Sequence, residues 1–199
     1  MERLFLFIKH NFYFLWIIIE WFNGVLFYII CGSRLNKTLI NVISEIKDSE
    51  FIFRVIEYPD LDMLNKMISK QNIDDLKYFN PHKFDMASLK RQYKKPAFLM
   101  MGSFDGEKMV GYFFLRFFIN RKCFVGRLID KDYRGKGIGQ TMNKIMYETA
   151  WRMGFRCLST ISKNNEMVMK AHSKNPYMKI LKKLDNDYLL VEFIKRADG

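Results

Sequence analysis

Apolar and polar positions follow two different periods along this chain, and the two periods predict strands and helices. Mainly apolar runs of strand length occur at residues 51–57, 97–104, 109–119 and 124–129. Asp105-Gly106 separates the second run from the third and is a strong hairpin signal. Further on, apolar residues recur every three or four positions from Met142 to Met153, which predicts an amphipathic helix.

The remaining segments predict more elements of the same two kinds. Residues 59–70 read as a helix that begins at Pro59, and residues 85–93 as a helix capped by Asp85. Gly154 suits the left-handed position that ends a helix. Additional elements are expected as a buried strand at 156–161, a short helix through Lys174, and a final hairpin of 178–184 and 188–194.

A glycine-rich segment, residues 132–140, lies where the strand-like run 124–129 ends and the amphipathic helix begins. Its three glycines within five residues let the backbone approach a ligand closely, and the free N–H groups of a helix start favour phosphate. Arg134 and Lys136 add positive charge. We interpret the segment as a pyrophosphate-binding loop, for which a glycine-rich solvent turn is the simpler alternative.

Two other phosphate-binding motifs fit this segment poorly. A Walker loop requires Gly-x-x-x-x-Gly-Lys followed by Ser or Thr, and no such run occurs in the chain. A dinucleotide fingerprint requires Gly-x-Gly-x-x-Gly after an early strand, with an acidic residue about twenty positions on. This segment instead reads Gly-x-Gly-x-Gly, lies late in the chain, and has residues 157–160 at that distance.

The segment resembles the Arg/Gln-x-x-Gly-x-Gly/Ala motif of the GCN5-related N-acetyltransferase (GNAT) superfamily, with Arg134, Gly137 and Gly139 at the motif positions. The resemblance extends over about residues 51–195. It implies an α/β (α+β) fold, with a central mixed, mostly antiparallel sheet flanked by helices. It also implies acetyl-coenzyme A as co-substrate, with its pyrophosphate held by Arg134, Gly135, Lys136, Gly137, Ile138 and Gly139.

The resemblance also implies roles for residues outside the loop. In the family a backbone N–H at the position of Ile129 donates to the oxyanion, and an Asn at the position of Asn165 contacts the pantetheine arm. The general acid is often a Tyr about seven residues later, and here that position holds His172. Many relatives place a carboxylate base on the strand before the loop, but residues 122–129 contain none.

A second histidine is a candidate for proton transfer, because imidazole titrates near neutral pH. His82 lies in a Phe-x-Pro-His-x-Phe element at residues 79–84, which resembles an element of some acetyltransferases and borders the acceptor cleft in this fold. For both His82 and His172 the alternative is a surface or capping residue. We expect both histidines to be catalytic candidates.

Transfer of an acetyl group to a primary amine is the activity that the resemblance implies. We expect an aminosugar of envelope polysaccharide assembly as the acceptor, because a basic face and a membrane-seeking helix both suit that role. One alternative is a long-chain N-acyltransferase that makes an N-acyl amino acid at the membrane. Another is a non-catalytic binding module that keeps the fold.

Charge and cysteine content narrow the partners further. The net charge of +12 resides in residues 51–199, since residues 1–50 carry five basic and five acidic side chains. A basic domain suits coenzyme A or an anionic membrane surface, and the chain lacks the sequence motifs of nucleic-acid-binding domains, so no nucleic-acid partner is expected. The three cysteines lack metal-ligand spacing, so we expect no metal site and a reducing compartment.

The first fifty residues form a separate segment in this interpretation, followed by the acetyltransferase domain at 51–199. Residues 12–31 are almost entirely apolar and are long enough to cross a bilayer, interrupted by Glu20, Asn23 and Gly24. The run could span the membrane, lie in its interface, or pack against the domain or a partner chain. We expect a cytoplasmic protein that associates with the membrane through this segment.

Overall fold

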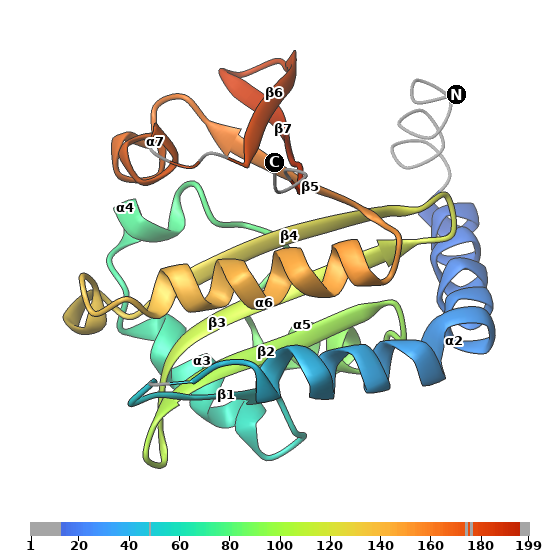
Figure 1. Cartoon of the computed structure of the whole chain (residues 1–199), viewed down its shortest axis with the longest axis horizontal. Coiled ribbons are helices and arrows are strands. Elements are labelled where there is room, and N and C mark those ends of the chain that lie inside the picture. The colour runs from blue at the N-terminus through green and yellow to red at the C-terminus, as the bar shows by residue number, and fades with distance from the viewer. Residues whose placement is uncertain (1–12, 48, 174, 176, 196–199) are drawn as a thin grey trace.

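The computed structural model describes residues 13–47, 49–173, 175 and 177–195. In these residues seven strands form one sheet in the order β1-β2-β3-β4-β5-β7-β6 (Figure 1). The strands are β1 (Ile52–Val55), β2 (Phe98–Asp105), β3 (Lys108–Phe118), β4 (Lys122–Ile129), β5 (Arg156–Ser162), β6 (Met178–Lys183) and β7 (Tyr188–Phe193). All neighbouring pairs are antiparallel except β4 and β5, which are parallel.

Helices cover both faces of the sheet. They are α2 (Tyr13–Ser44), α3 (Asp60–Ser69), α4 (Ile73–Leu76), α5 (Met86–Tyr93), α6 (Ile138–Arg152) and α7 (Glu166–Ser173), with a 3-10 turn, η1 (Lys131–Tyr133), before α6. Helices α2 and α6 lie on one face, and α3 and α5 lie on the other (Figure 1). The mixed, mostly antiparallel sheet and its flanking helices confirm the fold class expected from the sequence.

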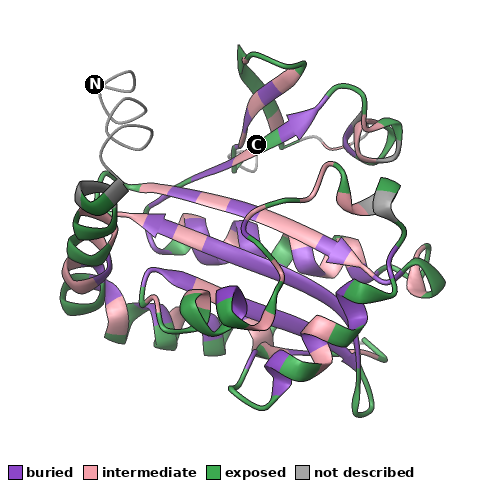
Figure 2. Cartoon of the chain, turned by 180° about the vertical axis from the view of Figure 1, so that it is seen from behind, coloured by how far each residue is buried: buried purple, intermediate pink, exposed green. Residues whose placement is uncertain are grey.

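Side-chain alternation along β3 divides the interior into two hydrophobic clusters. Phe113, Leu115 and Phe117 point to the α6 face, whereas Tyr112 and Phe114 point to the α3 face. Both sets are buried, and Figure 2 shows buried residues along most of the central strands. β3 is therefore the central strand from which both layers of helices are packed.

The sheet opens between β4 and β5. These two strands pair only from Lys122 to Phe124 on β4 and from Arg156 to Leu158 on β5. Beyond that point β4 runs on to Ile129 without a partner on this side, and Figure 1 shows β5, β6 and β7 turned away from β1 to β4. A parallel pair that separates after three residues leaves a gap in the middle of the sheet.

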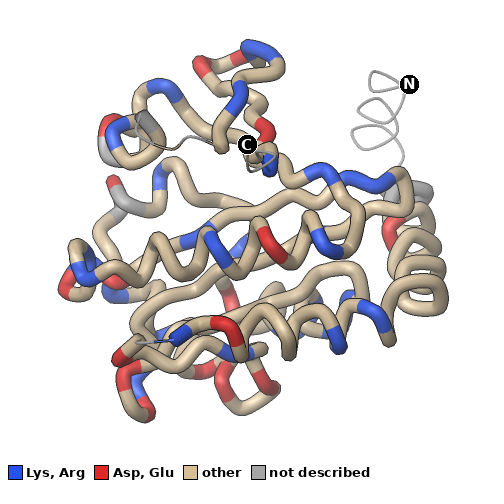
Figure 3. The backbone as a smooth tube through the Cα atoms, in the orientation of Figure 1, with Lys and Arg blue, Asp and Glu red and all other residues tan. Residues whose placement is uncertain are grey.

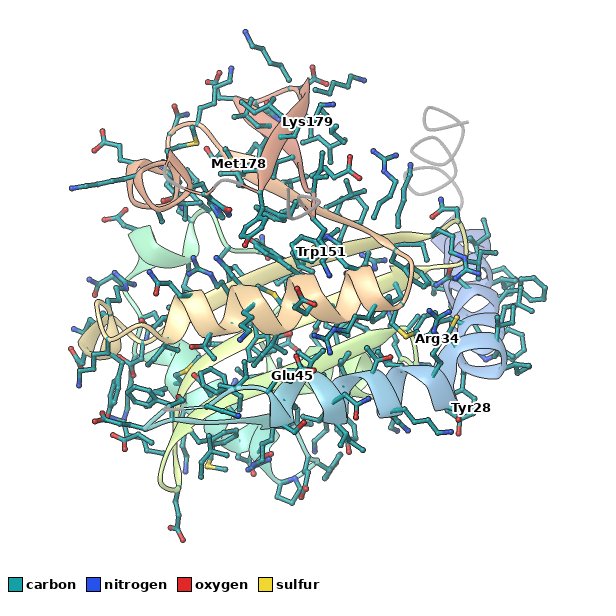
Figure 4. All side chains as sticks on the ribbon, viewed as in Figure 1. Tyr28, Arg34, Glu45, Trp151, Met178 and Lys179 are labelled. Carbon is teal, nitrogen blue, oxygen red and sulfur yellow. The ribbon has the colours of Figure 1, made fainter. Side chains whose placement is uncertain are left out.

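The helix α2 is continuous through the apolar run and the amphipathic stretch that follows it. One side of it belongs to the main hydrophobic cluster, through Phe27, Cys31, Leu35, Leu39 and Val42. In Figure 4 Arg34 and Glu45 point toward α6, where Arg34 donates to the Arg152 carbonyl oxygen at 2.7 Å and Glu45 pairs with the Arg152 guanidinium at 2.6 Å. One face of α2 is thus integrated into the fold.

The polar residues of the apolar run bind the domain. Glu20 pairs with Lys95 at 2.7 Å and with Arg116. Asn23 donates to the Phe117 carbonyl oxygen and accepts from the Ile119 N–H, both at 3.0 Å. These contacts attach the first half of α2 to the edge where β3 ends.

By length and composition alone, Ile17–Ser44 could still cross a membrane. The boundary at residue 50 stays a prediction.

Candidate active site

The glycine-rich segment forms the turn between β4 and α6, as its position in the sequence predicted. Gly135 and Gly137 have φ of +81° and +80°, a backbone conformation that residues other than glycine rarely adopt. Gly137 is the residue before the first turn of α6. The backbone N–H groups of residues 135–139 have no hydrogen-bond partner among the described residues. The turn therefore offers free donors at the positive end of a 15-residue helix.

Asp130 and Tyr133 hold this turn in place. The Asp130 carboxylate accepts from the Asp132 N–H at 3.1 Å, and the Asp130 N–H donates to the Val110 carbonyl oxygen at 2.9 Å. The Tyr133 hydroxyl donates to Asp105 at 3.0 Å, and the Lys136 ammonium lies 4.5 Å from the centre of the Tyr133 ring. The carboxylates of Asp130 and Asp105 therefore stabilise the conformation of the turn.

A cavity of about 670 Å³ occupies the gap between β4 and β5. On the α6 face its wall includes Arg127, Asn143, Tyr147, His172 and Phe193. On the α3 face its wall includes Tyr78, Phe79, Asn80, Pro81 and Phe114. The cavity thus reaches both faces of the sheet, so two ligands can meet inside it from opposite sides.

The structure brings most of the predicted site residues to this cavity. Ile129, Arg134, Asn165 and His172 line it. Gly135, Lys136, Gly137, Ile138 and Gly139 follow Arg134 directly and form the turn beside it. His82 does not belong to the wall formed by the described residues.

Comparison with known proteins identifies the family of this fold. Residues 66–174, more than half of the chain, match the model of the acetyltransferase (GNAT) family. The chain belongs to this family. The GNAT membership predicted from the Arg-x-x-Gly-x-Gly motif is confirmed, while no curated protein matches the sequence significantly.

Solved structures support the fold assignment. The GNAT domain of S. lividans PAT aligns with a TM-score of 0.61 at 12% identity, over 71% of this chain and 88% of that one. The PaiA N-acetyltransferase of Thermoplasma acidophilum, solved in complex with coenzyme A, aligns with a TM-score of 0.59 at 16% identity. The alignment covers 73% of this chain and 99% of that one. YncA, a putative acetyltransferase of Salmonella typhimurium with its cofactor acetyl-CoA, aligns with a TM-score of 0.54 at 14% identity. The alignment covers 73% of this chain and 92% of that one.

His172 of this GNAT protein is buried on α7 at the cavity wall. Its ring stacks at a tilt on Phe193, with the centroids 5.4 Å apart, and its Nδ1 lies 3.3 Å from the Asn175 amide nitrogen. Burial, and then the nearby charge of Arg127, lower the pKa of His172 to about 4. The imidazole is therefore neutral at pH 7, and its low basicity disfavours both proton acceptance and donation as an imidazolium there.

The lowered pKa of His172 predicts a pH-dependent loss of stability. The unfolded chain protonates this imidazole near pH 6.5 and the folded chain only near pH 4, so the stabilisation is complete above pH 6.5 and is lost as the pH falls toward 4. The full difference is about 3 kcal/mol. Thermal unfolding at pH 7 and 4.5 should show a smaller loss for His172→Gln than for the parent. Equal losses would contradict the lowered pKa.

His82 has a structural environment. Its Nδ1 donates to the Lys83 carbonyl oxygen at 2.8 Å, so its Nε2 is left to accept from the Tyr112 hydroxyl at 2.9 Å. The ring lies among Phe84, Phe98 and Tyr112, and burial lowers its pKa. Both ring nitrogens are thus used within the core of the α3 face. This arrangement supports the structural alternative for His82.

Arg127, Asn143 and Tyr147 are among the cavity residues that were not recognised in the sequence. Arg127 lies in an otherwise apolar strand, and its Nε donates to the Asn143 side-chain oxygen at 2.8 Å. Tyr147 lies one turn beyond Asn143 on α6, where burial raises the pKa of its phenol. The sequence does contain one signal for Arg127, which is a charged residue within the mainly apolar run 124–129. Residues two apart on a strand share a face, and Val125 and Ile129 both face α6.

Proposed function

We propose that this protein transfers an acetyl group from acetyl-coenzyme A to a primary amine. The observation that carries the proposal is the turn of free N–H groups at residues 135–139, which opens onto a cavity that passes through the sheet. A pyrophosphate carries two negative charges and many acceptor oxygens, which suit the donors of the turn and the charges of Arg134 and Lys136.

Backbone polarity along β4 supports a thioester site in the gap. Because the Asp130 N–H donates to Val110 on β3, the N–H groups of Ile129 and Arg127 point the opposite way, toward the gap where β5 no longer pairs. The Ile129 N–H can therefore donate to the thioester oxygen as negative charge develops on it. Asn165 lies across the gap, where its side-chain oxygen accepts from the Val168 N–H, leaving the amide N–H₂ group for a pantetheine carbonyl.

The amine acceptor would enter from the α3 face. There the wall combines the rings of Tyr78, Phe79 and Phe114 with the amide of Asn80. Aromatic faces and a few polar groups suit a ring that has both apolar faces and hydroxyl edges. This composition supports an aminosugar as the acceptor, as we inferred from the sequence.

The test is binding of acetyl-coenzyme A, measured by calorimetry, together with native mass spectrometry of the purified full-length protein. We expect one molecule of acetyl-coenzyme A or coenzyme A per chain, and acetyl transfer to an amine in a panel of nucleotide-linked aminosugars. Reaction only with a long-chain acyl carrier protein and an amino acid would replace the proposal by the N-acyltransferase alternative. Failure to bind any thioester would favour a non-catalytic module.

The outer face of α2 supports a location on the cytoplasmic side of the membrane, where acetyl-coenzyme A is available. Large apolar side chains cover this face and are exposed: Phe14, Ile17, Ile18, Trp21, Phe22, Tyr28, Ile29 and Ile30. Figure 4 shows Tyr28 pointing away from the domain, and in Figure 3 most of the first half of α2 is uncharged. Since Glu20 and Asn23 are turned inward to partners, they do not oppose contact with lipid.

These contacts support a helix that lies in the membrane interface. Because one side of α2 is docked on the domain over its length, the helix would place only its outer face among the lipids. Exposed basic residues adjoin this half of α2: Lys94 precedes Lys95, which binds Glu20, and Arg121 follows Ile119, which binds Asn23. They suit anionic headgroups.

Replacing Trp21 and Ile29 together by glutamine should weaken binding to anionic vesicles at least about tenfold, because each buried apolar side chain contributes about 1.5–3 kcal/mol. Vesicle co-sedimentation of the full-length protein measures this. The double variant Ile52→Gln, Ile180→Gln removes two exposed apolar side chains on β1 and β6, outside α2, and as the matched control should bind like the parent. A parent protein that stays in the supernatant would remove the membrane proposal.

A further inference from the structure

Arg127 is a positive charge in the cavity wall that no acidic side chain among residues 13–47, 49–173, 175 and 177–195 pairs with. Its Nε is held by the Asn143 oxygen at 2.8 Å, and no ion pair joins its guanidinium to a carboxylate among the described residues. On a second side, Nη1 would lie 2.9 Å from a Cβ atom at Gly139, so the start of α6 confines the group. The guanidinium is therefore positioned while its charge remains uncompensated within the fold.

An uncompensated, half-buried cation is costly unless a ligand supplies the anion. The charged and titratable side chains that line the cavity are Asp74, Tyr78, Arg127, Arg134, Tyr147, Glu166, His172 and Tyr188. Of these, Arg134 adjoins the pyrophosphate turn, and neither Asp74 nor Glu166 is bonded to Arg127. The anion expected at Arg127 must come from the ligand, at a point beyond the pyrophosphate turn.

His172 and Tyr147, two titratable groups on the same wall, are weak proton donors for a leaving group. His172 is neutral at pH 7, and burial holds the proton of Tyr147 tightly. A leaving thiolate would nevertheless place a full negative charge in this part of the cavity. Among the described wall residues on the α6 face, Arg127 supplies a permanent positive charge.

We propose that Arg127 binds the sulfur of coenzyme A as a thiolate and stabilises it as the leaving group. This inference rests on the proposed function and identifies the residue that replaces a general acid. The amine nitrogen forms a bond to the acyl carbon, the carbon–sulfur bond breaks with its electron pair going to sulfur, and the proton lost by the amine passes to water. Arg127 holds the resulting thiolate, and Asn143 positions Arg127.

Bound coenzyme A itself reports on this contact, without any need for the acceptor. A thiolate absorbs ultraviolet light at a longer wavelength than a thiol, so the thiol of bound coenzyme A can be titrated, with desulfo-coenzyme A as the blank. A cation within hydrogen-bond distance should lower the thiol pKa by roughly 1–3 units relative to free coenzyme A. Arg127→Met should abolish the shift and Arg127→Lys should retain part of it.

Lys122→Met removes the same charge from the first residue of β4, outside the cavity wall, and should leave the shift intact. A bound thiol that titrates like free coenzyme A in the parent would overturn the inference even if Arg127→Met did not fold. An Arg127→Met variant that keeps the full shift would also overturn it. Failure of the parent to bind coenzyme A at all would instead refute the proposed function, so the two failures are distinguishable.

Discussion

Replacing Gly137 by valine is expected to reduce the affinity for acetyl-coenzyme A by at least about 100-fold. Gly137 has φ of +80° and precedes the first turn of α6, where a β-branched residue is strongly disfavoured. Its Cβ would meet no protein atom within 4 Å, so the added side chain would project into open space beside the turn's free N–H groups. Calorimetric titration of the folded variant measures the loss.

Gly106→Val is the matched control for this substitution. Gly106 also has a positive φ, +56°, and open space around its Cβ, but it lies in the turn between β2 and β3. Both variants carry similar backbone strain, so they should lose similar stability. Equal affinities for acetyl-coenzyme A in the two variants would show that the turn at residues 135–139 does not bind the pyrophosphate.

Phe27→Ala is expected to lower the free energy of unfolding by about 3–5 kcal/mol, the usual cost of removing a buried aromatic ring. Phe27 is 1% exposed on the inner face of α2. Its ring stacks on Phe117 with the centroids 4.8 Å apart and meets Phe155 edge-on at 6.0 Å. Chemical unfolding in denaturant measures the change.

Ile29→Ala on the outer face of the same helix provides the comparison. Ile29 is 72% exposed, so its truncation should leave the free energy of unfolding within about 0.5 kcal/mol of the parent. Similar small effects from both substitutions would mean that α2 is not docked on the domain in solution.

Local sequence patterns were sufficient to predict most elements of the fold. Contacts between residues near in sequence decide the structure at the Asp105-Gly106 turn, the helix cap at Asp85 and the helix end at Gly154. The Asp85 carboxylate accepts from the Ser88 N–H at 2.9 Å, as expected of a cap. The short helix α4 was missed, because four residues are too few to show a helical period.

Long-range packing explains what the sequence could not predict. Glu20, Asn23 and Gly24 looked like interruptions of an apolar run, yet they form the side of α2 that meets the domain, with Gly24 close to Pro96. Their partners lie more than seventy residues away along the chain. No periodicity within the run reveals such partners.

The histidines show the same limit for the candidate site. The spacing from Asn165 correctly predicted that His172 lies at the cavity. The neutral state of its imidazole depends on burial and on Arg127, which lies on the distant strand β4. For His82 the hydrogen bond to Tyr112 decides its environment. The role of Arg127 likewise depends on the separation of β4 from β5, which is a property of the whole sheet.

Hydrogen–deuterium exchange of the full-length protein, with and without acetyl-coenzyme A, tests the central claim most directly. The amide hydrogens of residues 135–139 have no partners in the part of the chain that the structure describes and should exchange rapidly in the free protein. Acetyl-coenzyme A should slow their exchange, together with that of Ile129 at the end of β4. Saturating binding that leaves the exchange of this turn unchanged would contradict the account.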